Sequence, residues 1–350
     1  MPFCTVPRTS MFVTAVCAHV AAADTSAMMR RSLLLLSVLL AAPWCAALEL
    51  TVMMNGLPGA MGCEIAAACL RRAGVSLAPY ALTGPGQPDE VSVDDGSGGS
   101  LMTVKLYPPE ARDELAERVS ADYGSAPAGS FVCVDFTHPT AVNDNAEWYA
   151  STGMPFVMGT TGGDRDALTA CVDAAPKAYA VIAPNMAKQI VALQAALEQM
   201  ASEFPNSFEG YQLSVTESHQ SAKADTSGTA KAISSSLATL SGESKRFTEP
   251  FKAISRVRDP ILQRSGGGYL HQGVSPVPEK GISGHAFHTY SLTSGDGNVE
   301  FQIRHNVVGR STYAEGTVDA AVFLAGRVAA GAETRRYTMI DVLKAGEMES

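Results

Sequence analysis

Short apolar runs alternate with amphipathic segments in the first half of the chain. The runs typical of strands buried in a parallel sheet lie at 48–54, 131–136, 155–158 and 178–186. A helical segment at 140–149 separates two of these runs, and strand, helix, strand in this order predicts an α/β domain. A stretch rich in Gly, Pro, Asp and Ser at 85–99 interrupts the pattern and predicts a surface excursion.

A longer amphipathic helix follows the fourth run, with Asn185 as its predicted N-cap. Its apolar residues are spaced by three and four and form one stripe: Ile190, Leu193, Leu197 and Met200. Such a stripe is more simply explained as part of the hydrophobic core than as a functional feature. The helix therefore marks the passage from a first domain at 48–185 to a second domain at 186–309.

The second domain begins as a strand with one buried face, because apolar and polar residues alternate over 211–216. The alternation stops at Glu217, where a polar stretch begins, and we expect the strand to end there. Further strands predicted at 285–292 and 298–305 suit an open mixed sheet, so the second domain is α+β. Three histidines in these later strands are predicted to be packed or interfacial rather than catalytic: His285, His288 and His305.

Composition narrows the class of protein. The 350 residues are 46% hydrophobic and 17% charged, which is ample for a large core. The formal net charge of -9 and the absence of any Lys/Arg run argue against nucleic acid, whose phosphates demand clustered basic side chains. A small molecule is therefore the expected partner.

The first 47 residues are predicted to be a targeting leader. An arginine pair at 30–31 precedes an apolar run at 33–42, and small residues follow at 45–47, which is the order of a secretory-type signal peptide. The run is shorter than the roughly 20 apolar residues of a transmembrane helix. An uncleaved N-terminal anchor is the alternative.

Cysteine chemistry is not expected in the chain beyond the leader. Its cysteines show no CxxC or Cys/His ligand spacing: Cys63, Cys69, Cys133 and Cys171. Each is isolated or in an apolar setting, which favours buried small side chains over a disulfide framework or a metal site.

A glycine-rich turn joins the first strand to the first helix. Gly56, Gly59 and Gly62 follow the spacing Gly-x-x-Gly-x-x-Gly, a variant of the dinucleotide turn. Glycines let the backbone approach a pyrophosphate, which then lies at the positive end of the helix dipole. A glycine triplet alone is weak evidence, but its place between strand and helix is the context that the motif requires, so we predict cofactor binding.

The end of the next candidate strand bears on which dinucleotide binds. Thr83 and Gly84 stand where an NAD-binding protein usually has an acid that accepts hydrogen bonds from the ribose. Nothing there repels a 2′-phosphate, so NADPH is favoured and NADH stays possible. Lys105 and Arg112 are both candidates for the phosphate partner.

Two later strands end in polar turns, Thr137-His138-Pro139 and Gly159-Thr160-Thr161-Gly162. Open α/β sheets bind ligands beyond the carboxyl ends of their strands. We therefore expect both turns to contact a ligand.

The polar stretch at 217–231 holds the candidate chemistry. Ser227 is a predicted N-cap, so Ser227-Gly228-Thr229 would present backbone N–H groups to a carboxylate or phosphate. Lys223 can supply a balancing positive charge, and His219 can deliver a proton near neutral pH. With a dinucleotide site, this stretch supplies what an imine reduction needs: a hydride donor, a proton donor and a cradle for anionic groups.

Several linked motifs resemble one family. ESHQSAKADTSGTAK resembles the substrate loop of dihydrodipicolinate reductase (4-hydroxy-tetrahydrodipicolinate reductase), the lysine-pathway enzyme. NGLPGAMG, DFTHPTAV, GTTGGD, RDP, ISGHAFH and HNVVGRSTYAEGTVDAAVFLA occur in the family's order. The resemblance runs from about Leu48 to Val328 and is similar to the plant and algal branch.

Carried onto this chain residue by residue, the resemblance implies that His219 is the general acid and Lys223 the second essential charge. The implied substrate-binding residues are Thr161, Gln220, Lys223, Ser227, Gly228 and Thr229. The implied cofactor-binding residues, with Thr83 at the ribose position, are Gly56, Gly59, Met61, Gly62, Phe136, Thr137, Gly159 and Thr161. Two features depart from the bacterial pattern: Gln220 replaces a second histidine, and the proline before Ser-Gly-Thr is missing.

The resemblance also implies an architecture and a place in the cell. The fold would be an N-terminal Rossmann-like dinucleotide-binding domain, completed by the C-terminal helix at about 310–350, plus an α+β domain with an open mixed sheet. The reaction would be NAD(P)H-dependent reduction of 4-hydroxy-tetrahydrodipicolinate to tetrahydrodipicolinate. A homo-oligomer, dimer or tetramer, would act in the plastid, with no stable membrane association after leader removal.

Two alternatives stay open at this stage. A semialdehyde dehydrogenase shares the cofactor turn but needs a nucleophilic cysteine with a paired base, and neither Cys133 nor Cys171 is placed for attack. A non-catalytic NADPH-binding homologue is the other alternative. The intact set of His219, Lys223 and Ser-Gly-Thr argues against it.

Overall fold

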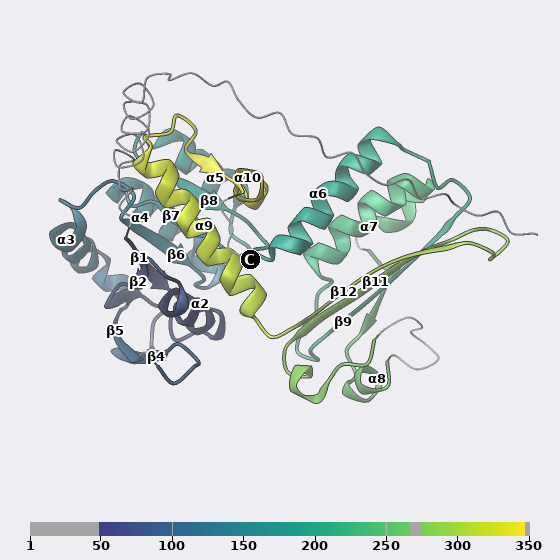
Figure 1. Ribbon diagram of the computed structural model, residues 1–350, viewed down its shortest axis with the longest axis horizontal. Helices are drawn as coiled ribbons and strands as arrows, with labels where there is room; N and C mark the ends of the chain where they lie inside the picture. The colour runs from purple at the N-terminus through teal and green to yellow at the C-terminus, as the bar shows by residue number, and fades with distance from the viewer. Residues whose placement is uncertain (1–48, 100, 249–250, 267–274, 347–350) are drawn as a thin grey trace, which may run out of the picture. The chain divides into compact units, whose positions relative to one another are not determined.

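A computed structural model describes residues 49–346, except 100, 249–250 and 267–274 (Figure 1). The predicted leader therefore lies outside the described residues. Within the described part of the chain, none of the helices combines the length and apolarity needed to cross a membrane.

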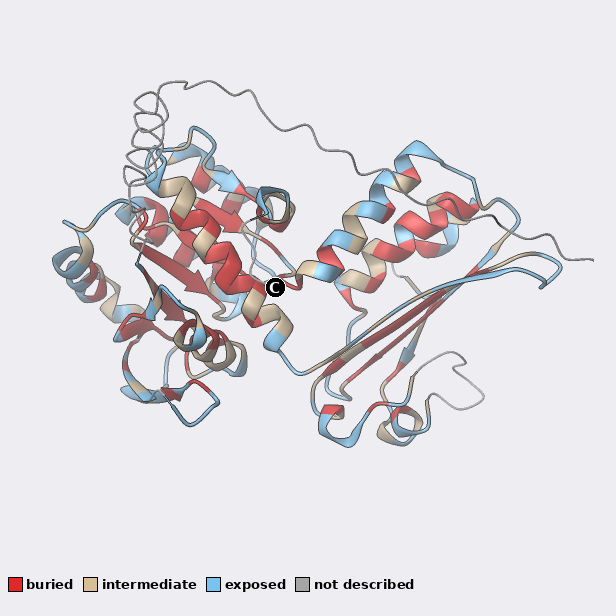
Figure 2. Cartoon of the chain, viewed as in Figure 1, coloured by how far each residue is buried: buried red, intermediate tan, exposed pale blue. Residues whose placement is uncertain are grey.

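A six-stranded parallel sheet forms the centre of the first domain, as the strand–helix–strand order predicted. Its strand order is β13-β8-β7-β6-β1-β2. The strands are β1 (Leu50–Asn55), β2 (Val75–Leu77), β6 (Phe131–Asp135), β7 (Phe156–Met158), β8 (Ala180–Ile182) and β13 (Arg336–Tyr337). The side chains of β1, β6 and β7 are almost all buried, which explains their uninterrupted apolar runs (Figure 2).

Helices cover both faces of this sheet. One face packs against α2 (Ala60–Arg71), α9 (Ser311–Ala329) and α10 (Met339–Ala345). The other packs against α3 (Arg112–Tyr123), α4 (Val142–Thr152) and α5 (Arg165–Ala174), with short 3-10 turns η1 (Pro109–Ala111) and η2 (Pro139–Ala141) before α3 and α4. The C-terminal helix α9 thus returns to the first domain, where it contacts β6, β7 and β8 (Figure 1).

The predicted surface excursion at 85–99 is wrong in part, because it contains a strand. β4 (Glu90–Asp94) pairs with β5 (Leu101–Tyr107), and β5 pairs with β3 (Tyr80–Leu82) in a separate three-stranded sheet. Val93 on β4 is buried in the same core as α2. The Gly, Pro and Asp residues mark the turns at the two ends of β4 rather than an irregular segment.

The second domain holds a four-stranded mixed sheet in the order β10-β9-β11-β12. Its strands are β9 (Gln212–His219), β10 (Ile254–Val257), β11 (His285–Thr293) and β12 (Glu300–Val308); β9 and β10 are parallel, and the other pairs are antiparallel. Two helices, α6 (Lys188–Glu203) and α7 (Gly228–Ser241), share a core with one face. Shorter elements are η3 (Ser244–Phe247), α8 (Pro260–Arg264) and η5 (Glu279–Gly281).

Two predicted boundaries are wrong. Helix α6 has Ala187 as its N-cap, and Asn185 lies two residues earlier, where its Oδ1 accepts the Ala187 N–H at 2.9 Å. Strand β9 does not end at Glu217 but continues to His219. The apolar and polar alternation stops there because the inward side chains become polar and paired, not because the strand ends.

Candidate active site

The glycine turn lies beyond the carboxyl end of β1, at the start of α2. A pocket of about 270 Å³ opens there, and its lining brings together five of the predicted cofactor residues: Gly56, Gly59, Thr83, Phe136 and Thr137. Met61 and Gly62 lie in the first turn of α2 and do not line this pocket. No acidic side chain lies in that first turn, so the positive end of the helix dipole is available to a phosphate.

Close backbone packing requires glycine in this turn. Gly56 has φ +103°, and a Cβ there would lie 2.3 Å from the carbonyl oxygen of Phe136. A Cβ on Gly59 would lie 2.7 Å from the carbonyl oxygen of Gly56, and a Cβ on Gly159 would overlap the Phe136 ring. The wall of the pocket at Gly56 and Gly59 is therefore bare backbone, which fits the pyrophosphate of a dinucleotide.

Asp135, which the sequence reasoning missed, holds the strand-end turns in place. Its buried carboxylate accepts hydrogen bonds from the backbone and hydroxyl of Thr137, the hydroxyl of Thr160, the amide of Asn145 and the hydroxyl of Tyr149. Thr160 is buried in this network, whereas the predicted Thr161 is exposed. The sequence signal that could have identified Asp135 was an acidic residue within a run predicted to be a buried strand, because a buried polar group needs hydrogen-bond partners.

A second pocket, of about 380 Å³, lies between the ends of β3 and β6. Thr83, Gly84, Gln87 and Arg112 are among its lining residues, and no carboxylate lines it. Arg112 donates one hydrogen bond to Asn145 Oδ1, while its Nε is buried without a partner among the described residues. The other sequence candidate, Lys105, lies beside Tyr107 and Glu114 instead.

Glu217 is buried at the end of β9 and reaches the start of α7. Its Oε1 accepts a hydrogen bond from Arg258 in an ion pair, and its Oε2 accepts the Ser227 backbone N–H at 2.9 Å. Arg258 also donates to the carbonyls of Lys223 and Asp225. These bonds tie the polar loop, the strand end and the N-cap of α7 into one unit, a role that the sequence did not assign to Glu217.

His219 is the last residue of β9 and is 7% exposed. Its Nδ1 donates to the carbonyl oxygen of His285 at 3.0 Å, and its Nε2 lies 3.2 Å from Nε2 of His288. Burial, followed by the positive charges of Arg258 and Lys223, lowers the pKa of His219 to about 3. The imidazole is therefore neutral at pH 7 in the unliganded protein.

The register of the sheet explains why these side chains meet. His288 pairs across the sheet with Glu217 on one side and with His305 on the other. Residues two apart on a strand share a face, so Glu217 and His219 continue the buried row of Leu213 and Val215. The histidines of β11 and β12 are packed as predicted, but His288 is packed against the candidate acid itself.

The rest of the predicted loop is arranged around the start of α7. Lys223 Nζ pairs with Asp225 Oδ1 at 2.7 Å. Ser227 is the N-cap of α7 as predicted, although its side chain makes no capping bond, and a Cβ on Gly228 would meet nothing within 4 Å. The hydroxyl of Thr229 accepts a hydrogen bond from the Asn185 side chain. Gln220 lies half-buried after β9, and its carbonyl accepts the Lys223 N–H.

Glu217, His219 and His288 each have a possible metal-ligand atom, and these three atoms lie within 4.8 Å of one another. Both oxygens of Glu217 already accept hydrogen bonds, and the guanidinium of Arg258 would repel a cation placed beside it. We therefore do not assign a metal site to this cluster.

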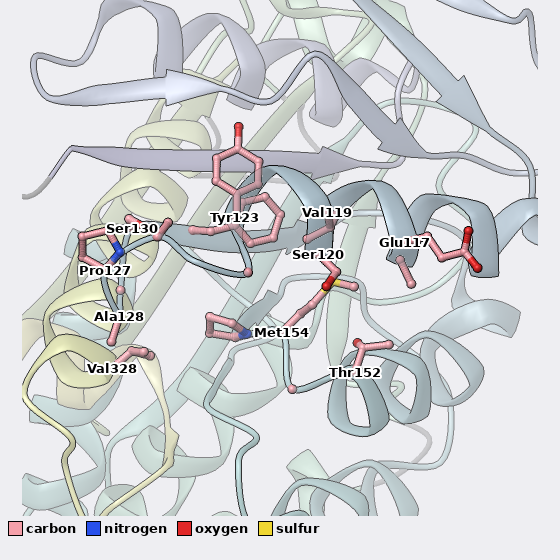
Figure 3. Close-up of a pocket in the computed structure, with 17 residues that line it drawn as sticks. Glu117, Val119, Ser120, Tyr123, Pro127, Ala128, Ser130, Thr152, Met154 and Val328 are labelled. Carbon is pink, nitrogen blue, oxygen red and sulfur yellow. The ribbon is translucent and has the colours of Figure 1, made fainter.

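A roomier pocket, of about 510 Å³, lies at the other end of the parallel sheet (Figure 3). It is lined by Tyr123, Phe131 at the start of β6, and Met154 shortly before β7, with Val328 from α9. Among the described residues that line it, Glu117 is the one acidic or basic side chain. Since this pocket lies away from the carboxyl ends of the strands and lacks converging polar groups, it is not the candidate site.

Comparisons with known proteins show the family of this chain. Models of one family match 50–186 (dihydrodipicolinate reductase, N-terminus) and 189–343 (dihydrodipicolinate reductase, C-terminus). The chain is 44% identical over 301 residues to 4-hydroxy-tetrahydrodipicolinate reductase 1, chloroplastic, of Arabidopsis thaliana, covering 85% of this chain and 79% of that protein. It is also 44% identical over 298 residues to a probable chloroplastic reductase of this name from Oryza sativa subsp. japonica, with the same two coverages.

Among solved structures, a dipicolinate-bound dihydrodipicolinate reductase from Paenisporosarcina sp. TG-14 aligns with a TM-score of 0.51 at 17% identity. The alignment covers 83% of this chain and 97% of that one. At this level of identity, the likeness supports the fold alone.

Proposed function

Since the chain belongs to the dihydrodipicolinate reductase family, we propose that it reduces 4-hydroxy-tetrahydrodipicolinate to tetrahydrodipicolinate with NADPH as hydride donor and His219 as proton donor. The roles of these residues are assigned from the hydrogen-bonded unit around Glu217 and Arg258. It joins the strand end that bears His219, the loop that bears Lys223 and the helix terminus at Ser227. A proton donor, a cation and an anion seat are thereby held together.

A nicotinamide dinucleotide is the cofactor, and it supplies the hydride. We assign its pyrophosphate to the bare backbone at Gly56 and Gly59 and its 2′-phosphate to Arg112. Arg112 supports NADPH because its buried Nε has no partner among the described residues and its pocket is free of carboxylates. A ribose diol would instead be expected to have an acid at Thr83 or Gly84.

The substrate carries two carboxylates, and the chain offers complementary charge to one of them at the start of α7. Backbone N–H groups at Gly228 and Thr229 and the ammonium of Lys223 would bind that carboxylate. Asp225, which pairs with Lys223, is exposed and can give way to a ligand. The open space around Gly228 leaves room for the approach.

Because the pKa of His219 is low, His219 can serve as the acid only when the bound substrate raises that pKa. An imidazole whose pKa is about 3 carries almost no proton at pH 7. The positive charges of Arg258 and Lys223 are among the causes, and a bound dicarboxylate would offset them and raise the pKa of His219 toward its usual range. Proton transfer is thus tied to substrate binding.

The relatives bear on the location of the protein in the cell, and the mixed sheet bears on its assembly. The plant relatives are named chloroplastic, and this chain acts in the plastid as well. We propose a homo-oligomer formed through the mixed sheet, because Val299, just before the edge strand β12, and Phe301, within it, are 43% and 50% exposed. Size-exclusion chromatography with light scattering tests the assembly, and a monomer at micromolar concentration would contradict it.

The test of function is a coupled assay. The upstream synthase generates the substrate from its own reactants, and absorbance follows oxidation of NADPH or NADH. We expect oxidation that depends on the synthase, with a higher kcat/KM for NADPH, and a loss of that preference in Arg112→Ala. No oxidation of either nucleotide would remove the proposed activity.

The structure gives the semialdehyde dehydrogenase alternative little support. Cys133 is fully buried in β6, and burial raises its pKa well above the usual value. Cys171 on α5 also has a raised pKa, caused first by burial. A raised pKa disfavours the thiolate that attack on an aldehyde requires, so alkylation of the thiols is expected to leave turnover intact.

A further inference from the structure

The contact between His219 and His288 is not explained by the proposed reaction, which uses His219 alone. The two Nε2 atoms lie 3.2 Å apart, and both lie within 4.0 Å of Glu217 Oε2. His288 is 2% exposed and lies on the central strand β11, between Glu217 and His305 in the sheet register.

The heavy-atom geometry fixes where each ring carries its hydrogen. A carbonyl oxygen can only accept, so His219 Nδ1 must donate to His285, and in the neutral ring Nε2 then holds a lone pair. His288 Nε2 must therefore be the donor in the contact between the rings. The Nδ1 of His288 is buried without a partner among the described residues, and a hydrogen there would be unsatisfied.

We propose that His288 is a positioning residue for His219: its Nε2–H donates to Nε2 of His219 and holds that ring in a single tautomer, with Nδ1–H on the His285 carbonyl. Nε2 is then the one position of His219 that can take up a proton, and that uptake requires the hydrogen bond from His288 to break. This inference rests on the proposed function, in which His219 is the acid.

The contact has a predictable effect on the proton affinity of His219. A donor to the lone pair stabilises the neutral ring, and His288 adds to the effect of burial in keeping His219 unprotonated until the substrate binds. The charged and titratable groups around the two rings come from β9, the loop after it, the turn after β10, β11 and β12: Glu217, Lys223, Arg258, His285, Tyr290 and His305.

Two substitutions of His288 separate donation from filling space. In His288→Gln the side-chain amide nitrogen takes the place of Nε2 and can still donate to His219. In His288→Asn the amide takes the place of Nδ1 and cannot. We expect His288→Asn to raise the pKa of His219 by about one unit and to lower kcat/KM roughly 10-fold, whereas His288→Gln stays within about threefold of the wild type.

The measurement is a pH titration of the unliganded protein with ¹⁵N-labelled histidine, in which His219→Asn identifies the resonances of His219. The wild type and His288→Gln should show one tautomer, and His288→Asn a mixture. His305→Gln is the control, because the His305 ring packs against His288 at 4.6 Å between ring centroids, but His305 makes no hydrogen bond with His219 among the described residues. It should leave that tautomer unchanged.

Two results would overturn the role of His288: an unchanged tautomer in His288→Asn, or equal losses in the Gln and Asn variants, which would mean that His288 only fills space. The titration needs no substrate and decides on His288 by itself. A wild-type protein that fails to oxidise NADPH in the coupled assay would instead remove the proposed function.

Discussion

The cofactor turn after β1 and the histidine cluster at the end of β9 are built on different principles. The turn is a backbone site, in which Gly56 and Gly59 bring main-chain atoms close together. The cluster is a side-chain site, in which Glu217 binds Arg258 from 41 positions away and His219 meets His288 from 69 positions away. A backbone site thus depends on local spacing, and a side-chain site on the register of distant strands.

The two sites should differ most in how substitutions affect turnover. We expect His219→Asn and Lys223→Ala each to lower kcat by about 10²- to 10⁴-fold, because each removes a group that acts on the reacting substrate. NADPH affinity, measured by fluorescence titration, should stay within about twofold of the wild type, since the backbone site is untouched. A variant with near-wild-type kcat would exclude its residue from the mechanism.

The second contrast concerns stability. Glu217→Gln leaves the charge of Arg258 unpaired next to a buried position, and we expect a loss of about 3 kcal/mol in unfolding free energy. The exposed pair of Asp173 and Arg336 provides the matched control, because Asp173→Asn should lower the unfolding free energy much less than Glu217→Gln does. Urea titrations measure both values. Equal losses would show that Glu217 does not organise the site.

The fold followed from the sequence where the signal was local. Buried parallel strands give uninterrupted apolar runs, and the apolar sequence of α9 identified it as a helix. Its return to the first domain was implied by the family resemblance. Strand β4 was missed because its five residues lie within a segment dominated by turn-forming residues.

The site was predicted unevenly for the same reason. Gly56, Gly59, Thr83, Phe136 and Thr137 meet in one pocket, as the spacing and the family resemblance implied. The roles of Glu217, Arg258 and His288 were not predicted. A charged residue such as Glu217 interrupts the apolar and polar alternation and indicates the end of a strand, unless its distant partner is known. The strand was therefore ended too early.

A third test compares glycines of the two regions. Gly56→Ala places a Cβ 2.3 Å from the Phe136 carbonyl at φ +103°, so we expect a loss of about 2 kcal/mol in stability and roughly 10-fold weaker NADPH binding. Gly228→Ala meets open space, and stability should change by less than about 0.5 kcal/mol. Thermal unfolding and cofactor titration distinguish the two. A Gly228 variant as unstable as the Gly56 variant would contradict the assignment of the first turn as the backbone site.

The last contrast concerns the pH dependence of stability in the histidine cluster. Burial lowers the pKa of His305 to about 4, below the value of about 6.5 for an unfolded chain. Between these values the unfolded state binds the proton and the folded state does not, so stability falls as pH drops from 6.5 to 4, by at most about 1.4 kcal/mol per pH unit for one histidine.

His305→Gln removes that contribution, and we expect its unfolding free energy to fall less steeply with decreasing pH, by about 1 kcal/mol per unit. Urea titrations at several pH values between 4 and 6.5 measure the slopes. Parallel slopes for the wild type and His305→Gln would mean that His305 takes up its proton as readily in the folded protein as in the unfolded chain. The histidine cluster would then not be a closed, neutral site, and this difference from the cofactor turn would be lost.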